Sequence, residues 1–305
     1  MYNPFPFDDP KPVNRPALSK ETIDSIVAGG TPNVAKKFVA QIADRVRTEG
    51  VIVGIDGYTT ANWNLFVNLL ARECVINGFE FETVDANKAT LKSGKEIDDM
   101  IDPLLIWDTK IDPTLLYGKL YHGGYIGLFD QEKMEQFRKD VPAMKTPGKL
   151  VVVAGYGSMI AELRDLYDVK CWFDITPMKT MLRIRGGEYS NLGKEHPGII
   201  NRTIRRCYYC DFECAVQLRK DLWKNNVPDY FFLDNDPKKL QMMPFEAFSK
   251  ICAELVKYPF RAKPCYLEGV WGGSYMKKHR NLPEEMRNAA WVFDFIPMEV
   301  SVLVE

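Results

Sequence analysis

The sequence predicts an α/β fold, in which a doubly wound parallel sheet is flanked by helices and followed by a short C-terminal β-containing tail. Three observations predict it: short apolar runs typical of buried strands, glycine-bounded turns after two of them, and helical segments between them. Alternation of strands with helices favours parallel pairing. The predicted strands are residues 51–53, 79–84, 149–154, 169–175 and 230–233, and the predicted helices include residues 31–46, 159–166 and 244–256.

The length of 305 residues indicates about two domains, or one large domain with an appendage. Residues 1–32 are expected to form a proline-rich arm and a helix that begins at Ser19. Residues 33–257 are expected to form the main domain, with Thr31 as the N-cap of its first helix and Pro32 as the first helical residue. The composition changes at Tyr258, so residues 258–305 are predicted to be a separate tail.

The charge is balanced, with 40 basic and 41 acidic residues and a formal net charge of −1. Such balance argues against a nucleic-acid or membrane-surface partner. The sequence shows neither a signal-peptide pattern nor an apolar run of the ~20 residues that a membrane span needs. A cytoplasmic location is therefore expected.

The seven cysteines are expected to be reduced thiols, because their number is odd and no secretion signal accompanies them. Cys207, Cys210 and Cys214 have spacings that place them on one helical face, where cysteine packs as a small apolar residue. A structural zinc would need a fourth ligand, such as Cys171, Cys252 or Cys265. Core packing without a metal is the prediction.

The stretch from Val51 to Leu70 predicts a strand, a glycine-bounded turn and an amphipathic helix. This arrangement presents backbone N–H groups and a helix N-terminus to an anion, so a phosphate-binding loop is the first hypothesis and an ordinary βα turn is the alternative. The pattern G-x-x-x-x-G-K-[ST] fails at its second glycine, lysine and hydroxyl positions. The predicted loop comprises Gly57, Tyr58, Thr59, Thr60, Ala61, Asn62, Trp63 and Asn64, of which the last three stand at the failing positions.

Two further features accompany this loop. Asp85 closes the second predicted strand, where parallel sheets place ligands, although a solvated turn carboxylate is the alternative. A basic run around Gly186 and Gly187 could close over a phosphorylated ligand, although a solvated helix face is the alternative for each residue. The residues proposed for such a lid are Arg183, Arg185, Arg202 and Arg205.

Four segments together resemble the uridine kinase and phosphoribulokinase branch of the P-loop kinases: GIDGYTT at 54–60, Asp85, VVVAGYG at 151–157 and the stretch 165–187. The resemblance covers about residues 33–255. It implies a P-loop fold, a phosphate-binding loop over residues 57–64, Asp85 as the group that handles the acceptor hydroxyl, and a lid formed by the arginines named above. ATP and Mg²⁺ are the implied cofactors, while the lysine that reaches the β- and γ-phosphates is absent.

The tail looks like the opening of a class I mannose-6-phosphate isomerase of the cupin type, with Trp-Gly-Gly at 271–273, Trp291 and Ser301. The whole chain also looks similar to the N-terminal half of longer bacterial proteins of this kind, in which a kinase-like region precedes the cupin. The histidine and glutamate metal ligands of that isomerase are not among these residues. His122, His196 and His279 lack metal-ligand spacing.

Three functions follow as hypotheses. The first is a kinase-like domain that binds a phosphorylated sugar or nucleotide in support of sugar-phosphate isomerase chemistry. The second is an active nucleoside or sugar kinase in which another cation replaces the loop lysine. The third is a non-catalytic interaction domain, in which Trp63 fills the loop. A homo-oligomer is compatible with each of them.

Overall fold

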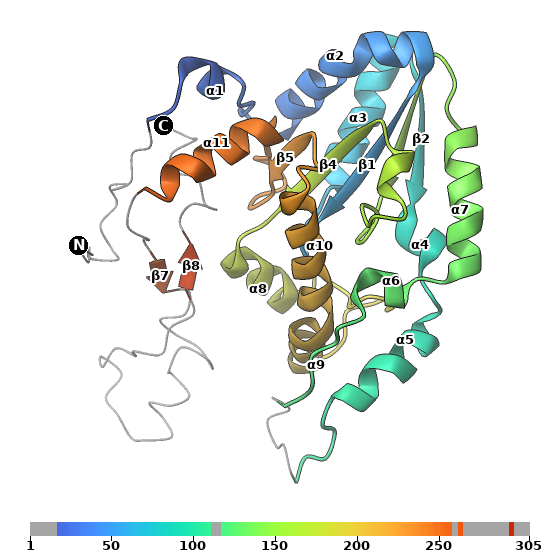
Figure 1. Cartoon of the computed structure of the whole chain (residues 1–305), viewed down its shortest axis with the longest axis vertical. Coiled ribbons are helices and arrows are strands. Elements are labelled where there is room, and N and C mark those ends of the chain that lie inside the picture. Colours follow the sequence, from blue (N-terminus) through green and yellow to red (C-terminus); the bar gives the residue numbers. More distant parts are fainter. Residues whose placement is uncertain (1–16, 111–116, 258–261, 265–292, 296–305) are drawn as a thin grey trace.

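The computed structural model of the chain describes residues 17–110 and 117–257 in full, and residues 262–264 and 293–295 as backbone (Figure 1). In the tail, β7 (Ala262–Pro264) and β8 (Phe293–Phe295) pair antiparallel. The Trp-Gly-Gly segment, Trp291, Ser301, His279 and Cys265 lie outside the described residues, so the isomerase-like features stay a prediction.

A six-stranded sheet forms the centre of the molecule, with the strand order β2-β3-β1-β4-β5-β6. The first five strands are parallel, and β6 pairs antiparallel with β5 at one edge. This sheet confirms the predicted fold class, whereas β6 was not predicted. The strands are β1 (Val51–Gly57), β2 (Glu80–Asp85), β3 (Lys149–Ala154), β4 (Val169–Asp174), β5 (Tyr230–Leu233) and β6 (Gln241–Pro244).

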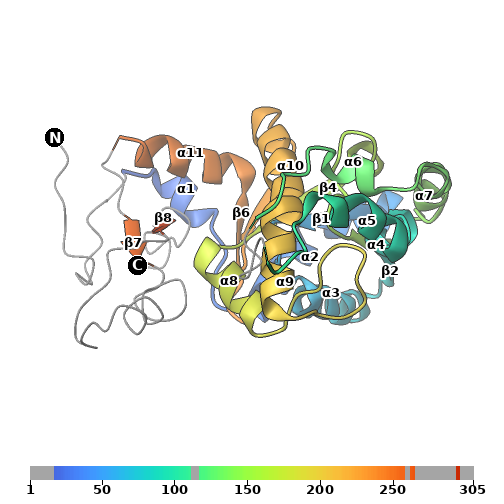
Figure 2. The same ribbon diagram turned by 90° about the horizontal axis from the view of Figure 1, so that it is seen from below.

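Helices cover both faces of the sheet, as Figure 2 shows. On one face, α2 (Thr31–Glu49) and α3 (Asn64–Asn77) pack against the sheet. Alternate side chains of β1 face opposite ways, so Val53 joins this core and Ile52 joins the other. The elements with buried residues in the other core are α4 (Ala86–Thr90), α5 (Gly94–Ile101), α6 (Gly124–Leu128), α7 (Gln131–Ala143), α10 (Phe212–Lys224) and α11 (Phe245–Leu255).

The remaining elements are short. In Figure 1, α8 (Pro177–Arg185) and α9 (Ile200–Arg206) lie below the ends of the strands, beside the lower part of α10. None of the helices in the described part of the chain is long and apolar enough to cross a membrane. The short elements are α1 (Lys20–Asp24), η1 (Asp102–Leu104), η2 (Arg164–Leu166), α8 (Pro177–Arg185), α9 (Ile200–Arg206) and the π-helical segment η3 (Cys207–Asp211).

Three predicted boundaries are wrong for identifiable reasons. Gly30, with φ of 93°, is the N-cap of α2, because the Thr31 hydroxyl donates to the Pro237 carbonyl instead of capping its own helix. The expected turn at Gly54–Gly57 is part of β1, which pairs with β4 as far as Gly57. Residues 159–166 form successive turns and η2 instead of an α-helix.

The chain reverses its winding direction next to β1. The connection from β1 to β2 runs through α3 on one face, whereas Met159 and Leu163, between β3 and β4, belong to the core on the opposite face. In parallel α/β sheets, ligands bind outside the carboxyl ends of the strands at such a switch point. The carboxyl ends of β1 and β3 are therefore where a site is expected.

Candidate functional site

The loop from Gly57 to Asn64 lies directly against the end of β4. A Cβ atom on Gly57 would stand 2.6 Å from the Phe173 carbonyl oxygen, so only glycine fits there. The Tyr58 amide donates to the same carbonyl at 2.9 Å. Thr59, Thr60 and Ala61 are buried, and Thr60 has a φ of 75°, which is uncommon for a residue other than glycine. The loop is thus tightly fitted to the sheet.

One backbone amide of the loop binds an anion that the chain itself supplies. The Asn62 N–H donates to Asp234 Oδ2 at 2.6 Å. Asp234 follows β5 directly, and it is fully buried. A loop amide that meets a carboxylate from a neighbouring strand end has the chemistry of an anion site.

Arg183 of α8 supplies the positive charge beside this carboxylate. Its Nη1 donates to Asp234 Oδ2 at 2.7 Å and its Nη2 to Oδ1 at 3.1 Å, so the pair is bidentate. Nη1 also donates to the Thr60 carbonyl at 2.8 Å, and Nη2 to the Asp234 carbonyl at 2.8 Å. Burial raises the pKa of the Asp234 carboxyl, while Arg183 and the Asn62 amide act in the opposite direction. We call Asn62, Arg183 and Asp234 the carboxyl-edge triad.

Aromatic side chains pack around the end of the loop. The Trp63 ring contacts Tyr156 edge-on at 5.0 Å and lies 6.2 Å from Phe173, measured between ring centroids. The Tyr156 hydroxyl donates to the Ala61 carbonyl at 2.9 Å. The residue at the lysine position of the motif therefore serves packing, and Asn64, at the hydroxyl position, is exposed.

Asp56, inside β1, joins the loop to the second glycine turn. Its carboxylate accepts the amides of Gly57 at 2.7 Å, Gly157 at 3.1 Å and Met159 at 2.8 Å. Burial raises the pKa of the Asp56 carboxyl to about 7, although the hydrogen bonds from these backbone N–H groups act in the opposite direction. Asp56 thus fixes the second glycine turn to the end of β1.

Two more buried carboxylates complete the edge. Asp174, at the end of β4, lies 3.4 Å from Arg219, whose guanidinium also stacks 4.7 Å from the Tyr58 ring. Asp211, in η3, accepts from the Tyr189 hydroxyl at 2.9 Å and from the Asn191 amide at 2.8 Å. Burial raises the pKa of both carboxyls. Such π-helical segments are frequent at functional sites.

The structure brings Arg183 to the loop, and it places the other predicted residues elsewhere. Asp85 is exposed and caps α4 by accepting the Lys88 amide at 3.0 Å. Arg185 is exposed, whereas the guanidinium groups of Arg202 and Arg205 lie 5.3 and 4.2 Å from the centre of the Trp107 ring. Whether Asp85 or these arginines act on a ligand stays a prediction.

The sequence analysis did not select Asp56, Asp174 or Asp234. Each stands in or directly after a buried apolar strand. An aspartate at such a position can be singled out from the sequence, because an ionised group in or after a buried strand needs partners from neighbouring strand ends.

The three clustered cysteines are buried, as expected for core packing. Within the described residues, no group of three or more histidine, cysteine, aspartate or glutamate side chains is placed to hold a metal ion. The Mg²⁺ ligand position of the motif is the exposed Asn64. The loop therefore does not fit a Mg²⁺–ATP complex of the usual kind.

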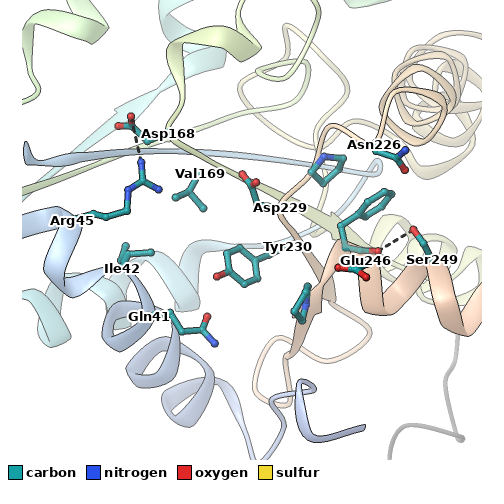
Figure 3. A pocket seen from close by; sticks show the side chains of 13 residues that line it. Gln41, Ile42, Arg45, Asp168, Val169, Asn226, Asp229, Tyr230, Glu246 and Ser249 are labelled. Atoms are coloured by element: carbon teal, nitrogen blue, oxygen red, sulfur yellow. Dashed lines mark hydrogen bonds and ion pairs between the residues drawn. The ribbon is translucent and has the colours of Figure 1, made fainter. Parts of the chain in front are cut away.

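A cavity of about 640 Å³ lies at the opposite, amino edge of the sheet (Figure 3). Residues from α2, from the starts of β4 and β5 and from the start of α11 line it, and Tyr230 lies at its centre in Figure 3. Asp168 on its rim accepts the Ile52 amide at 2.8 Å and Lys145 Nζ at 2.7 Å. Arg45 lies 3.7 Å from Asp168 on the same rim.

The fold and the site define a class: an α/β protein with a mostly parallel sheet, in which the loop of a strand–loop–helix unit at the switch point binds a buried carboxylate of the chain itself. The chain belongs to the family described as a domain of unknown function, DUF8485, whose model matches residues 35–257. No curated protein matches the chain.

Three kinases are among the solved structures to which the chain is similar. A possible uridine kinase from Bacillus stearothermophilus has a TM-score of 0.39 and 11% identity, with 65% of this chain and 97% of that chain covered. Phosphoribulokinase from Rhodobacter spheroides has a TM-score of 0.34 and 11% identity, with coverage of 68% and 96%. Shikimate kinase from Bacteroides thetaiotaomicron has a TM-score of 0.33 and 12% identity, with coverage of 68% and 99%. Because these values are low, the function is argued from the site itself.

Proposed function

We propose that this chain is a kinase-like domain that binds a phosphorylated small molecule at the carboxyl edge of its sheet and does not transfer the phosphoryl group. One observation carries the proposal: an anionic group already lies against a loop amide and a buried arginine, in the carboxyl-edge triad. Loop amides with an arginine are the usual means by which proteins hold phosphate.

The absence of transfer follows from the loop side chains. Phosphoryl transfer depends on charge stabilisation at the β- and γ-phosphates and on a bound Mg²⁺. Trp63 and Asn64 occupy the positions that would provide the lysine and the metal-binding hydroxyl. Asp85, the residue proposed to handle the acceptor hydroxyl, makes a helix cap at the surface.

A phosphorylated sugar or a nucleotide is the proposed ligand. The sugar-phosphate alternative is supported by the resemblance of the tail to mannose-6-phosphate isomerase. Isothermal titration of the full chain with mannose 6-phosphate and ADP, against mannose and adenosine as controls, tests it. We expect heat from the phosphorylated compounds alone.

A coupled ADP-release assay with ATP and a set of nucleosides and sugars tests the second half of the proposal. We expect no ADP release above that of the buffer. Turnover with any acceptor that is reduced by Asp85→Asn would instead establish an active kinase with an atypical loop.

A second candidate function is a non-catalytic interaction domain. It is favoured by the same internal contacts, because the Trp63 ring packs at the end of the loop and the Asp234 carboxylate binds the Asn62 amide. The titration separates the two functions, since an interaction domain releases no heat with any phosphorylated compound.

A further inference from the structure

The Asp234 carboxylate has the position and partners of a bound anion. It accepts the Asn62 amide at 2.6 Å and a bidentate pair of bonds from Arg183. We propose that Asn62 and Arg183 form the phosphate site of this domain, and that a phosphate monoester binds there by displacing the Asp234 side chain. This inference rests on the proposed function and specifies where the ligand binds and what competes with it.

Arg183 is positioned independently of the carboxylate that it binds. Its two terminal nitrogens also donate to the carbonyl oxygens of Thr60 and Asp234, both at 2.8 Å. The arginine side chain is 7% exposed, so its orientation is fixed by packing as well. The guanidinium therefore stays at the loop when the carboxylate leaves, and the site is preformed for another anion.

A phosphate monoester suits this site better than a second carboxylate. A phosphate dianion carries more charge and one more terminal oxygen, and arginine binds such oxygens in a bidentate manner. The same loop contains a buried hydroxyl, Thr60 Oγ1, that has no hydrogen-bond partner. Thr60 also has the left-handed φ of 75°, and strained residues of this kind cluster at ligand sites.

Asp234 begins the turn to β6, in which Asp236, Lys238 and Lys239 are exposed. A displaced carboxylate therefore regains hydration close to its present position.

If Asp234 and phosphate compete for the same donors, the affinity of the wild type for phosphate is lowered in proportion to the fraction of molecules in which the site is free of Asp234. Asp234→Asn keeps the shape and removes the charge, so it takes away the competitor while Arg183 remains. We expect the dissociation constants for inorganic phosphate and mannose 6-phosphate, measured by titration calorimetry on the full chain, to fall by roughly ten-fold or more.

The matched control is Asp168→Asn. Asp168 also accepts one backbone amide, from Ile52, and pairs with cations, Lys145 and Arg45, but it lies at the amino edge of the sheet. We expect this control to leave both dissociation constants unchanged. Adding Arg183→Gln to Asp234→Asn is expected to abolish the gain, because the cation of the site is then missing.

The outcomes separate the two proposals. Binding by the wild type with no gain in Asp234→Asn overturns the exchange and leaves the proposed function standing, whereas no phosphate binding by any variant overturns both. Should Asp234→Asn not fold, the amide signal of Asn62 in a ¹H–¹⁵N spectrum of the wild type decides. A large shift of that signal at saturating phosphate supports the exchange, and an unmoved signal during measurable binding overturns it.

Discussion

The two edges of the sheet use charged residues in opposite ways. At the carboxyl edge, Asp56, Asp174 and Asp234 are fully buried and meet amides or arginines from other elements. At the amino edge, Asp168 is 21% exposed in its pair with Lys145, and a cavity of about 640 Å³ stays open beside it. The edge where ligands of parallel sheets bind is thus the edge that the chain has filled itself.

The largest difference between the edges is expected when the cation of each ion pair is removed. Arg183→Met leaves Asp234 buried without its cation, and it should lower the free energy of unfolding by about 3–5 kcal/mol. Lys145→Met removes one of the two cations beside the more exposed Asp168, leaves Arg45 in place, and should cost about 0–1 kcal/mol. Urea denaturation of both variants measures the difference.

The double variant Arg183→Met with Asp234→Leu is the control for this prediction. It replaces the buried pair by apolar groups, so it should recover most of the stability lost in Arg183→Met. Equal losses in Arg183→Met and Lys145→Met would contradict the contrast between the edges.

A second difference should appear as a pH dependence. In the folded chain the pKa of Asp56 is raised to about 7 from 3.8, so the folded state keeps a proton that the unfolded state releases. The stability from this group is complete below the unfolded pKa and is lost as the pH rises towards 7. The loss amounts to about 2–4 kcal/mol at most.

Chemical denaturation of the wild type and Asp56→Asn between pH 5 and pH 8 tests this effect. The variant is less stable at low pH, because the single oxygen of its amide group cannot replace both oxygens of Asp56, of which Oδ1 accepts the Gly57 and Gly157 amides and Oδ2 the Met159 amide. Its free energy of unfolding should nevertheless fall less steeply with pH than that of the wild type. If the free energies of unfolding of the two proteins fall equally with pH, Asp56 is not the source of the pH dependence.

The fold was predictable because each buried strand is a compact apolar run. Residues 149–154 and 230–233 match β3 and β5 as predicted. β6 was missed because the sequence Gln-Met-Met-Pro is short and ends in proline, and only its pairing with β5 makes it a strand. In place of the helix predicted at 159–166, the amides of Ile160, Leu163 and Leu166 donate to carbonyls three residues earlier, which gives successive turns.

The site was only partly predictable for a similar reason. The position of the loop and the involvement of Arg183 could be inferred from spacing and charge. Its pairing with Asp234 could not, because the two residues are 51 positions apart and meet only when β5 and α8 have been placed. Tertiary contacts, and not motif spacing, decide which anion the loop holds.

A third prediction concerns the aromatic end of the loop. Trp63→Ala removes the contacts with Tyr156 and Phe173, and it should lower the free energy of unfolding by about 1–3 kcal/mol, since the indole is only partly buried. Thermal denaturation measures the loss. No change in stability would show that the ring does not support the loop.

The smallest effect is expected at the rim of the amino-edge cavity. Glu246 is 78% exposed and pairs with Lys250 one helical turn away, so Glu246→Ala should leave the free energy of unfolding, measured by urea denaturation, unchanged. It should also leave phosphate affinity unchanged. A loss of phosphate binding in this variant would place the ligand at the amino edge and contradict the contrast between the edges.

The most direct test of the account is a crystal structure of the full chain grown with mannose 6-phosphate or ADP. We expect a phosphate oxygen within hydrogen-bond distance of the Asn62 amide and of Arg183, with the Asp234 side chain turned away from both. A bound phosphate elsewhere on the chain, with Asp234 still held by Asn62 and Arg183, would contradict the central claim.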